Sequence, residues 1–490
     1  MDEMLSSGRT IATDGLLDTL AGYAAADRPL APATTRIAAL TLMDALACAA
    51  GALAHRPALL GPLFEGTGGH GARVPATDIE ADPVKAAFDT SLLIRWLDFS
   101  DTSILGGHPS DNLGAILAAA EYRSRQLVAE GRAPLVMDEV FRAIRTAYEI
   151  QGCLASNKLD GTGIGLDHVF YVKMASAAVA AKLLGGDAKV IRAALSNAVL
   201  DSQSLNAYRH VPNAGPRKGW AGADAASRGL MLAALALKGE PGYRQPLSAP
   251  IWGFEAVHLG GKPLTLGREP GDFFLDRVIF KLVPCQRNGS TAVEAAMRLH
   301  AWFAGHGFEA TRIEIFTQDE AMRRIVKSGP LSNSEARDHC LQYMVAVALL
   351  TGRLSASSYG DVAASDPRID ALRDVTEVVE KAEYTRDHHD PAIASCANAI
   401  RVTAKDGAVS ELIEVAYPIG DPIRRDEAAP LLAAKFDDLA ASVWGEARRR
   451  SVVALFAEPA RLAAMPVPDF LDQVAERPIE GDRTVSYLKS

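Results

Sequence analysis

Apolar residues recur at helical spacing through the first half of the chain. Residues three and four apart share one face of an α-helix, so this spacing predicts a succession of helices with apolar faces. Glycines such as Gly185 and Gly239 follow several of these segments, as is typical of helix ends. No motif recurs at a fixed period, which favours one large helical domain over a repeat array. The predicted helices cover residues 34–54, 84–96, 113–127, 137–155, 168–184, 188–204 and 220–238.

The pattern changes after about Tyr243. Residues 243–274 are rich in proline, glycine and aromatic side chains, and we interpret them as an irregular connection carrying a short hairpin. Beyond them, alternation of apolar and polar residues predicts three strands, the last two of which flank a Lys-Asp-Gly turn typical of a β-hairpin. These strands cover residues 312–317, 397–404 and 411–417, and helical patterns lie between them at residues 293–304 and 338–350.

The chain becomes helical again after Pro422, which indicates that it returns to the first domain. The predicted fold class is therefore mainly α, a large all-helical domain with an inserted smaller α+β domain. The inserted segment has the usual size of a domain. The predicted boundaries are residues 1–276 for the first part of the helical domain, 277–420 for the α+β domain and 421–490 for the C-terminal part of the helical domain.

Composition and charge limit the classes of function. The chain has 490 residues, 48% of them hydrophobic, and a formal net charge of -9. An acidic chain lacks the basic surface that nucleic-acid binding requires, so we expect no nucleic-acid partner. An anionic substrate would need a local cluster of positive charge.

Two further observations bear on the compartment. The N-terminal residues have no basic start with a long apolar run, and the longest apolar stretch, residues 38–54, is interrupted by Asp44. We expect that stretch to be a buried core helix and not a membrane span. The five cysteines are scattered without a CxxC pair, which disfavours disulfides, zinc and iron–sulfur clusters. A cytoplasmic location and no metal ligand set are expected.

The densest set of chemically useful side chains lies at residues 97–112, LDFSDTSILGGHPSDN, between two predicted helices. Asp98, Thr102 and His108 lie in this linker, and Ser110 or Asp111 can cap the helix that follows. His108 is therefore expected at the lip of a helix N-terminus, where the dipole favours an anion. A titratable imidazole beside carboxylates is a plausible acid/base site. The alternative is a polar loop with cap residues.

Other candidates are spread along the chain. His168 begins a strong helical pattern, which repeats the expected setting of His108. Lys281 lies within an apolar run, where a lysine either reaches the surface or lines a cleft. Tyr343 lies on an apolar helix, where a core position is the alternative to a functional one. One loop gathers groups suited to a polycarboxylate, or is simply solvated: Tyr208, Arg209, His210, Arg217 and Lys218.

Two other motifs are interpreted as structural features and not as binding sites. GTGIG at residues 161–165 follows a helix and not a strand, so we interpret it as a flexible loop and not a dinucleotide fingerprint. The adjacent His388 and His389, before Pro391, are interpreted as an exposed turn and not a metal site.

Segments spread over nearly the whole chain, in order, resemble the MmgE/PrpD family. They are RWLDFSDT with GHPSDN, GLDHVFYVKMAS, YRHVPNAGPRKGWAGADAASR, APIWGF, DHCLQYMVAV and YPIG. The resemblance implies a helical domain completed by the C-terminal helices, an α+β domain that acts as a lid, and a homodimer. It also implies catalysis without a metal or organic cofactor, on a small tricarboxylate and without a membrane partner.

The resemblance also implies site residues. The matching positions are Asp98, Thr102, His108, His168, Lys218, Lys281 and Tyr343. The chain departs from the family in the loop after Lys281, which reads VPCQRNG and is one residue shorter. Gln286 stands there where an ionisable side chain is usual, and Asn288 where a histidine is usual.

The activity that the resemblance implies is a hydro-lyase reaction on 2-methylcitrate, with citrate as an additional candidate substrate, giving 2-methyl-cis-aconitate in propionate catabolism. We expect His108, His168, Lys218, Lys281 and Asp98 to carry the chemistry. The substrate is expected to contact Thr102, Tyr343, His210, Arg217, Gln286 and Asn288. The alternatives are a related tricarboxylate decarboxylase or isomerase, similar to cis-aconitate decarboxylase, and a catalytically weak paralogue that binds tricarboxylates.

Overall fold

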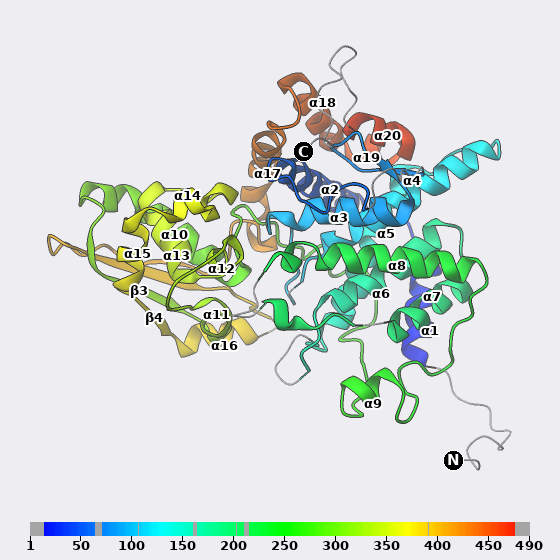
Figure 1. Cartoon of the computed structure of the whole chain (residues 1–490), viewed down its shortest axis with the longest axis horizontal. Coiled ribbons are helices and arrows are strands. Elements are labelled where there is room, and N and C mark those ends of the chain that lie inside the picture. Colours follow the sequence, from blue (N-terminus) through cyan, green and yellow to red (C-terminus); the bar gives the residue numbers. More distant parts are fainter. Residues whose placement is uncertain are drawn as a thin grey trace.

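The computed structural model describes residues 14–63, 71–105, 107–159, 164–201, 203–209, 215–390 and 392–475, and the chain is mostly helical over these ranges. Two bodies stand side by side (Figure 1). The larger body consists of helices from both ends of the chain, and the smaller body contains a sheet. Each has its own cluster of buried apolar side chains.

The helical body begins with a run of helices whose ends follow local capping rules. Asp82 accepts a hydrogen bond from the Val84 amide ahead of α3, and Asp187 accepts one from Val190 ahead of α7. A two-stranded ribbon, β1 (Ala72–Arg73) with β2 (Glu80–Ala81), joins α2 to α3. The helices are α1 (Gly15–Ala25), α2 (Pro32–Leu53), α3 (Pro83–Trp96), α4 (Leu113–Ala129), α5 (Met137–Ala155), α6 (Val169–Leu183), α7 (Ala188–Leu200), α8 (Ala221–Leu237) and α9 (Phe254–His258).

The sheet-containing body follows. Its four strands lie in the order β4-β3-β5-β6, with β3 parallel to β4 and antiparallel to β5. The strands are β3 (Ala310–Thr317), β4 (Thr376–Glu380), β5 (Asn398–Ala404) and β6 (Ile413–Val415). The helices are α10 (Ser290–Gly305), α11 (Asp319–Ile325), α12 (Ser334–Arg337), α13 (Leu341–Thr351), α14 (Asp361–Ala364), α15 (Pro367–Asp374) and α16 (Ala382–His389).

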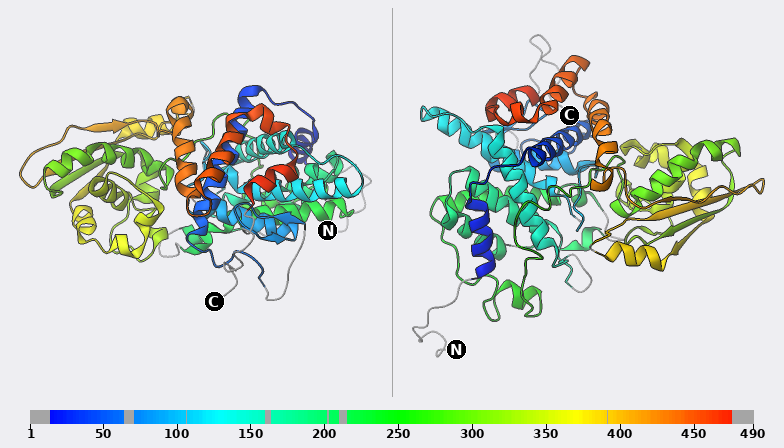
Figure 2. Two further views of the ribbon diagram at one scale, coloured as in Figure 1. Left: turned by 90° about the horizontal axis from the view of Figure 1, so that it is seen from above. Right: turned by 180° about the vertical axis from the view of Figure 1, so that it is seen from behind.

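The last helices return to the helical body. Phe436 and Phe470 join the apolar cluster of that body, and α17 runs along the boundary between the two bodies in all views (Figures 1 and 2). These helices are α17 (Arg425–Ala440), α18 (Glu446–Ala457), α19 (Pro459–Ala463) and α20 (Val467–Val474).

The apolar helix α2 was predicted to be a core helix and not a membrane span. Among the described residues it is the one helix long and apolar enough to cross a membrane, but most of that stretch is buried inside the molecule. Its Asp44 is also buried and pairs with Lys435 of α17 at 2.7 Å. Burial against protein and an internal ion pair both favour a core helix.

Most predicted elements are confirmed, and the differences concern helix ends, one connection and one strand. The helix predicted at residues 188–204 ends at Leu200, because Asp201 turns away to pair with Lys173. Residues 243–274 contain the short helix α9 and no strand, so the predicted hairpin there is wrong. His388 and His389 end α16 and do not form a turn, and strand β4 was missed.

Candidate active site

The segment between α3 and α4 centres on Asp98, a buried residue with a φ of 48°. Its carboxylate lies 2.5 Å from Arg95 Nη1, 2.7 Å from Lys281 Nζ and 3.4 Å from Lys218 Nζ. Burial alone would raise the pKa of Asp98, but these cations hold it well below its usual range. Asp98 is therefore a fixed negative charge that gathers three cations, one from the end of α3 and two from distant parts of the chain.

His108 lies beside this carboxylate, with Nε2 3.6 Å from Asp98 Oδ1. Its Nδ1 is 2.7 Å from the Asp101 carbonyl, which can only accept, so Nδ1 carries the proton and Nε2 keeps a lone pair. Burial, and then the charges of Arg95 and Lys281, lower the pKa of His108 well below its usual value. His108 is a neutral imidazole with its basic nitrogen directed at the Asp98 cluster.

The predicted helix-lip position of His108 is confirmed in part. His108 precedes a short 3-10 turn, η2 (Pro109–Asn112), and that turn leads into α4. Neither Ser110 nor Asp111 caps α4, because both lie within the turn. Asn112 occupies the N-cap position, and its side chain makes no capping hydrogen bond to α4. The capping prediction for these two residues is wrong.

Thr102 and His168 border the same region. Thr102 donates to the Gly107 carbonyl at 2.9 Å, and its backbone pairs with Ile279, two residues before Lys281. His168 is the N-cap residue of α6, as predicted, and its ring centroid lies 6.2 Å from that of His108. Asp167 lies 3.2 Å from His168 Nδ1. The structure thus brings Thr102 and both histidines together around residues 97–112.

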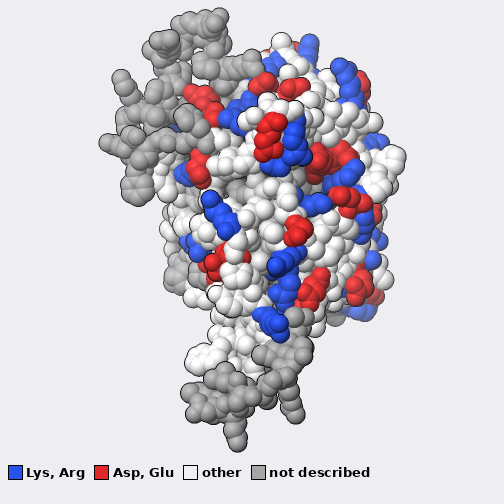
Figure 3. Space-filling view, turned by 90° about the vertical axis from the view of Figure 1, so that its right-hand side faces the viewer, with Lys and Arg blue, Asp and Glu red and all other residues white. Residues whose placement is uncertain are grey.

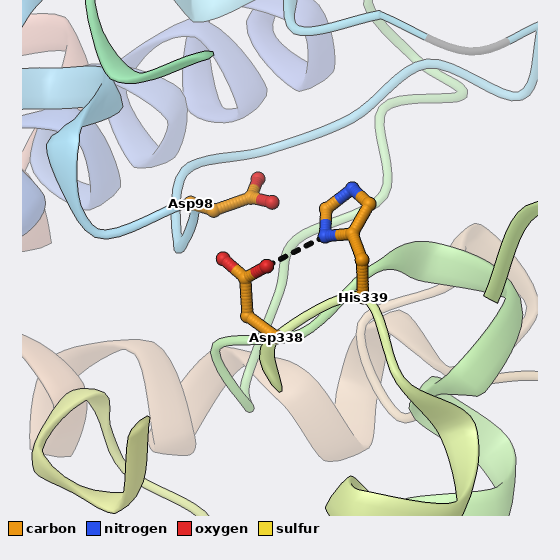
Figure 4. A group of neighbouring side chains, drawn as sticks. All are labelled: Asp98, Asp338 and His339. Atoms are coloured by element: carbon orange, nitrogen blue, oxygen red, sulfur yellow. Dashed lines mark hydrogen bonds and ion pairs between the residues drawn. The ribbon is translucent and has the colours of Figure 1, made fainter. Parts of the chain in front are cut away.

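Lys218 connects the helical body to the sheet-containing body. Its Nζ lies 2.5 Å from Asp338 Oδ2, and Asp338 Oδ1 lies 2.7 Å from His339 Nδ1. Figure 4 shows Asp98, Asp338 and His339 facing one another across the boundary. Burial opposes ionisation of Asp338, but Lys218 and then His339 lower its pKa. Lys281, on the other side of Asp98, has its pKa lowered by burial.

A cavity of about 250 Å³ opens at this boundary. Side chains from both bodies line it, so its shape depends on how the two bodies sit against each other. The polar and aromatic lining includes His55, Arg95, Asp98, Lys218, Asp338 and Tyr359. A small organic anion fits the size and the local positive charge of such a cavity.

Asp98, Asp338 and His339 also place one ligand-type atom each within 4.8 Å of one another, a spacing that a metal ion could bridge. The Lys218 ammonium, however, already contacts both carboxylates. Adding a metal cation beside Lys218, Lys281 and Arg95 would be opposed by like charge. The arrangement fits an ion-pair cluster better than a metal centre.

Two other predicted site residues, Arg217 and Tyr343, have contacts with residues outside the Asp98 cluster. Arg217 pairs with Asp224 at 3.1 Å and stacks over Trp220. Tyr343 is buried in the second apolar cluster and donates to the Ser358 carbonyl at 2.8 Å. His210 lies outside the described residues, as do residues 161–163 of the GTGIG motif.

The loop after Lys281 uses its amide side chains internally. Gln286 Oε1 accepts from the Asn288 backbone amide at 2.7 Å, and Asn288 Oδ1 accepts from Cys396 Sγ at 3.5 Å. Arg287, between them, donates to the Ile104 carbonyl at 3.0 Å. This loop therefore ties the sheet-containing body to the segment that carries Asp98 and His108.

Sequence reasoning missed Arg95, Asp338 and His339. Arg95 lies on a buried face of α3, and an arginine at such a position in an apolar pattern is a signal that it has a fixed partner. Asp338 and His339 were included in a predicted helix, whereas α13 begins at Leu341. Nothing in the local sequence reveals that they meet Lys218.

Fold and site together define a mostly helical protein with a buried acid/base cluster at the boundary of two bodies. The chain belongs to the MmgE/PrpD family: residues 18–267 match its N-terminal domain and residues 283–458 match its C-terminal domain.

Several similar proteins are 2-methylcitrate dehydratases. The chain is 48% identical to 2-methylcitrate dehydratase of Cupriavidus necator over 444 residues, which cover 89% of this chain and 91% of the relative. It is 45% identical to 2-methylcitrate dehydratase of Escherichia coli K12 over 88% of this chain and 91% of the relative. It is 42% identical to the mitochondrial 2-methylcitrate dehydratase of Yarrowia lipolytica over 89% and 86%.

Proposed function

We propose that this protein is a hydro-lyase that dehydrates 2-methylcitrate to 2-methyl-cis-aconitate, as a cytoplasmic step of propionate catabolism, without a metal or organic cofactor. The observation that carries the proposal is the cluster of Arg95, Lys218 and Lys281 around Asp98, with the basic nitrogen of His108 beside it. The names of the relatives above support the choice of substrate.

The charge of the cluster suits a tricarboxylate. Arg95, Lys218 and Lys281 face the carboxylates of Asp98 and Asp338, which leaves one unit of positive charge. The rest of the molecule is acidic, so attraction of an anion must be local. On the face drawn in Figure 3, described acidic and basic side chains are interspersed.

Dehydration requires three roles. A base removes a proton from the carbon beside a carboxylate, an acid protonates the departing hydroxide to give water, and cations stabilise the charge that develops on that carboxylate. We assign the acid and base roles to His108 and His168 and the cationic role to Lys218 and Lys281. Asp98 holds these groups in place. Thr102, Tyr343, His210, Arg217, Gln286 and Asn288 are proposed substrate contacts.

We further propose that the sheet-containing body is a lid and that the protein is a homodimer. The lid would comprise residues 277–420, inserted between helical segments 1–276 and 421–490. Two observations support the lid: the second apolar cluster is built from residues 285–415, and both bodies line the cavity at Asp98. Closure of such a lid excludes water from the reaction.

A second candidate, a decarboxylase or isomerase of a related tricarboxylate, follows from the loop after Lys281. Gln286 and Asn288 supply no ionisable group there, and the side-chain oxygens of both already accept bonds, from the Asn288 backbone amide and from Cys396 Sγ. A changed loop beside the site could redirect the chemistry or leave a weak tricarboxylate-binding paralogue.

One experiment distinguishes these functions. Purified protein is incubated separately with 2-methylcitrate, citrate and cis-aconitate, and the conjugated alkene is followed by absorbance while carbon dioxide is trapped. The dehydratase forms alkene from 2-methylcitrate without carbon dioxide. Carbon dioxide release identifies a decarboxylase, and tight tricarboxylate binding without turnover identifies the paralogue.

A further inference from the structure

The connection between α12 and α13 carries two titratable residues with no role in the scheme above, Asp338 and His339. They belong to the sheet-containing body but face Asp98 of the helical body (Figure 4), and Asp338 also pairs with Lys218. The side chain of His339 is 18% exposed, so it is largely enclosed but still reached by solvent, and its neighbour Asp338 lines the cavity.

The contacts fix the tautomer of His339. Nδ1 lies 2.7 Å from Asp338 Oδ1 and 3.2 Å from Lys218 Nζ. The lysine already directs a proton to Asp338 Oδ2 at 2.5 Å, and the ionised carboxylate can only accept. The neutral ring therefore donates Nδ1–H to Asp338 and keeps its lone pair on Nε2. A carboxylate behind an imidazole also stabilises the imidazolium that forms when Nε2 takes up a proton.

We propose that His339, oriented by Asp338 and supplied by the sheet-containing body, is the base of this site in place of His108, and that His168 is the acid. The proposal rests on the dehydration proposed above. Nε2 of His339 takes the proton from the carbon beside a carboxylate, and the electron pair of that C–H bond forms the double bond. Hydroxide leaves with a proton from the imidazolium of His168, which the Asp167 carboxylate 3.2 Å from Nδ1 stabilises, and departs as water. His339 and His168 then return to their starting states by proton exchange with solvent.

The surroundings keep His339 ready to accept a proton. Burial and then the Lys218 charge lower the pKa of His339, while Asp338 and then Asp98 raise it, and the sum is a lowered pKa. Among the described residues, these three have the largest electrostatic effects on the ring, and Lys327 lies close enough to interact with Asp338 and Lys218. The ring is therefore neutral near pH 7, as a general base must be.

The first test is His339→Gln, with His300→Gln as the matched control. His300 lies in the same body and makes one comparable bond, from Nδ1 to the Leu349 carbonyl at 2.8 Å, away from the site. Loss of a catalytic base lowers kcat by about a hundredfold or more, and the control stays within about threefold of wild type. Folding of both variants is checked by circular dichroism. Turnover of 2-methylcitrate by His339→Gln within threefold of wild type would overturn the proposal.

The second test separates a chemical role from a structural one. Asp338 raises the pKa of His339, so Asp338→Asn must lower that pKa further. The acidic limb of the kcat/KM profile then moves to lower pH, and kcat falls because the ring loses its orienting carboxylate. A uniform loss at every pH with an unmoved acidic limb would overturn the role of His339 as the base.

The third test does not depend on turnover. Diethyl pyrocarbonate labelling of the wild-type protein is followed by peptide mass spectrometry, with citrate as the protecting probe and the more exposed His306 as an internal reference. We expect citrate to slow labelling of His339 and to leave that of His306 unchanged. If the wild type does not dehydrate 2-methylcitrate, the proposed function fails, but protection of His339 still supports its place in the anion site. Equal labelling of His339 with and without citrate would overturn the inference.

Discussion

Asp98 shows how one residue can organise a site. Its φ of 48° is rare for a residue with a side chain, and the neighbouring contacts hold it there. Lys281 donates to both the backbone carbonyl and the carboxylate of Asp98, at 2.9 and 2.7 Å. One lysine thus fixes the backbone turn and balances the charge that the turn presents. We infer that Asp98 and Lys281 act as one unit.

This coupling gives a testable double-mutant cycle. Lys281→Met and Asp98→Asn should each lower kcat/KM for 2-methylcitrate by about ten- to a hundredfold, because each charged hydrogen bond is worth roughly 1.5–3 kcal/mol. The double variant should lose much less than the two effects combined, since each single change already breaks the shared contact. Lys262→Met, at an exposed position, serves as control. Simple additivity within experimental error would show that the two residues act separately.

His108 gives a prediction about pH and stability. Its pKa is lowered in the folded protein, and an unfolded histidine titrates near about 6.5. Below that pH, His108 is protonated in the unfolded chain but stays neutral in the folded protein. The contribution of His108 to the unfolding free energy is therefore complete above about pH 6.5 and declines as the pH falls.

His108→Gln removes this proton linkage. The difference in unfolding free energy between wild type and variant should shrink by up to about 1.4 kcal/mol for each pH unit below 6.5, measured by urea denaturation at pH 8, 6.5 and 5. Thr90→Val, a buried change without a titrating group, should give a difference that does not vary with pH. A constant difference for His108→Gln would mean that the ring titrates normally in the folded protein.

At the scale of elements, local patterns were enough for most helices but not for pairings across the chain. Helix α5 was predicted at its observed bounds because its apolar and polar positions separate cleanly. The hairpin of β5 and β6 was predicted from its turn residues. Strand β4 exists because it pairs in parallel with β3, some sixty residues away in sequence, and no local signal reports that.

The same limit applies to the site. Asp98, Thr102 and His108 could be predicted together because they lie in one short segment between two helical patterns. The contact of Lys218 with Asp338 spans 120 residues and depends on how the two bodies meet, so the residues alone could not reveal it. Tyr343 was a candidate by resemblance, but its hydroxyl is bonded to the Ser358 carbonyl. To donate a hydrogen bond to a substrate carboxylate, Tyr343 would have to give up that bond.

Helix α17 makes its own prediction, because it carries a buried lysine beneath the site. Lys435 Nζ contacts Asp44 at 2.7 Å and donates to the carbonyls of Phe99 and Lys281 at 2.7 and 2.9 Å. It therefore ties together the two backbone segments that present Asp98 and Lys281. Lys435→Met leaves the Asp44 carboxylate buried without its partner and should lower the unfolding free energy by about 3–5 kcal/mol, measured by urea denaturation.

Two further variants complete that measurement. Lys405→Met breaks an exposed ion pair with Glu309 and should change the unfolding free energy by less than about 1 kcal/mol. Asp44→Asn combined with Lys435→Met should recover much of the loss, because no uncompensated charge remains buried. A loss below 1 kcal/mol for Lys435→Met would show that Asp44 takes up a proton and needs no cation.

At the scale of the whole molecule, the proposed lid is joined to the helical body by two chain crossings. Arg425, at the start of α17, donates to the carbonyls of Asp276 and Val278 at 3.2 and 2.7 Å, so the outgoing and returning crossings are bound to each other. A largely apolar cavity of about 450 Å³ lies between the bodies, lined on opposite sides by Val283 and Leu439 among others. Space beside a narrow pair of crossings is what hinged movement requires.

The hinge predicts a ligand-dependent change in proteolysis. Trypsin should cut the returning crossing after Arg424 or Arg425 in the free protein, because their hydrogen bonds break when the bodies separate. A tricarboxylate held between Lys218 and Lys281 favours the closed arrangement and should slow that cleavage several-fold, in proportion to its occupancy. Cleavage after Arg132, in an exposed turn at the far end of α4, reports only local opening and should not change. Peptide mass spectrometry of timed digests with and without citrate measures both sites in one sample. Equal slowing at Arg132 would indicate general stabilisation of the fold, and no slowing at Arg424 and Arg425 at saturating citrate would show that the sheet-containing body does not close over its ligand.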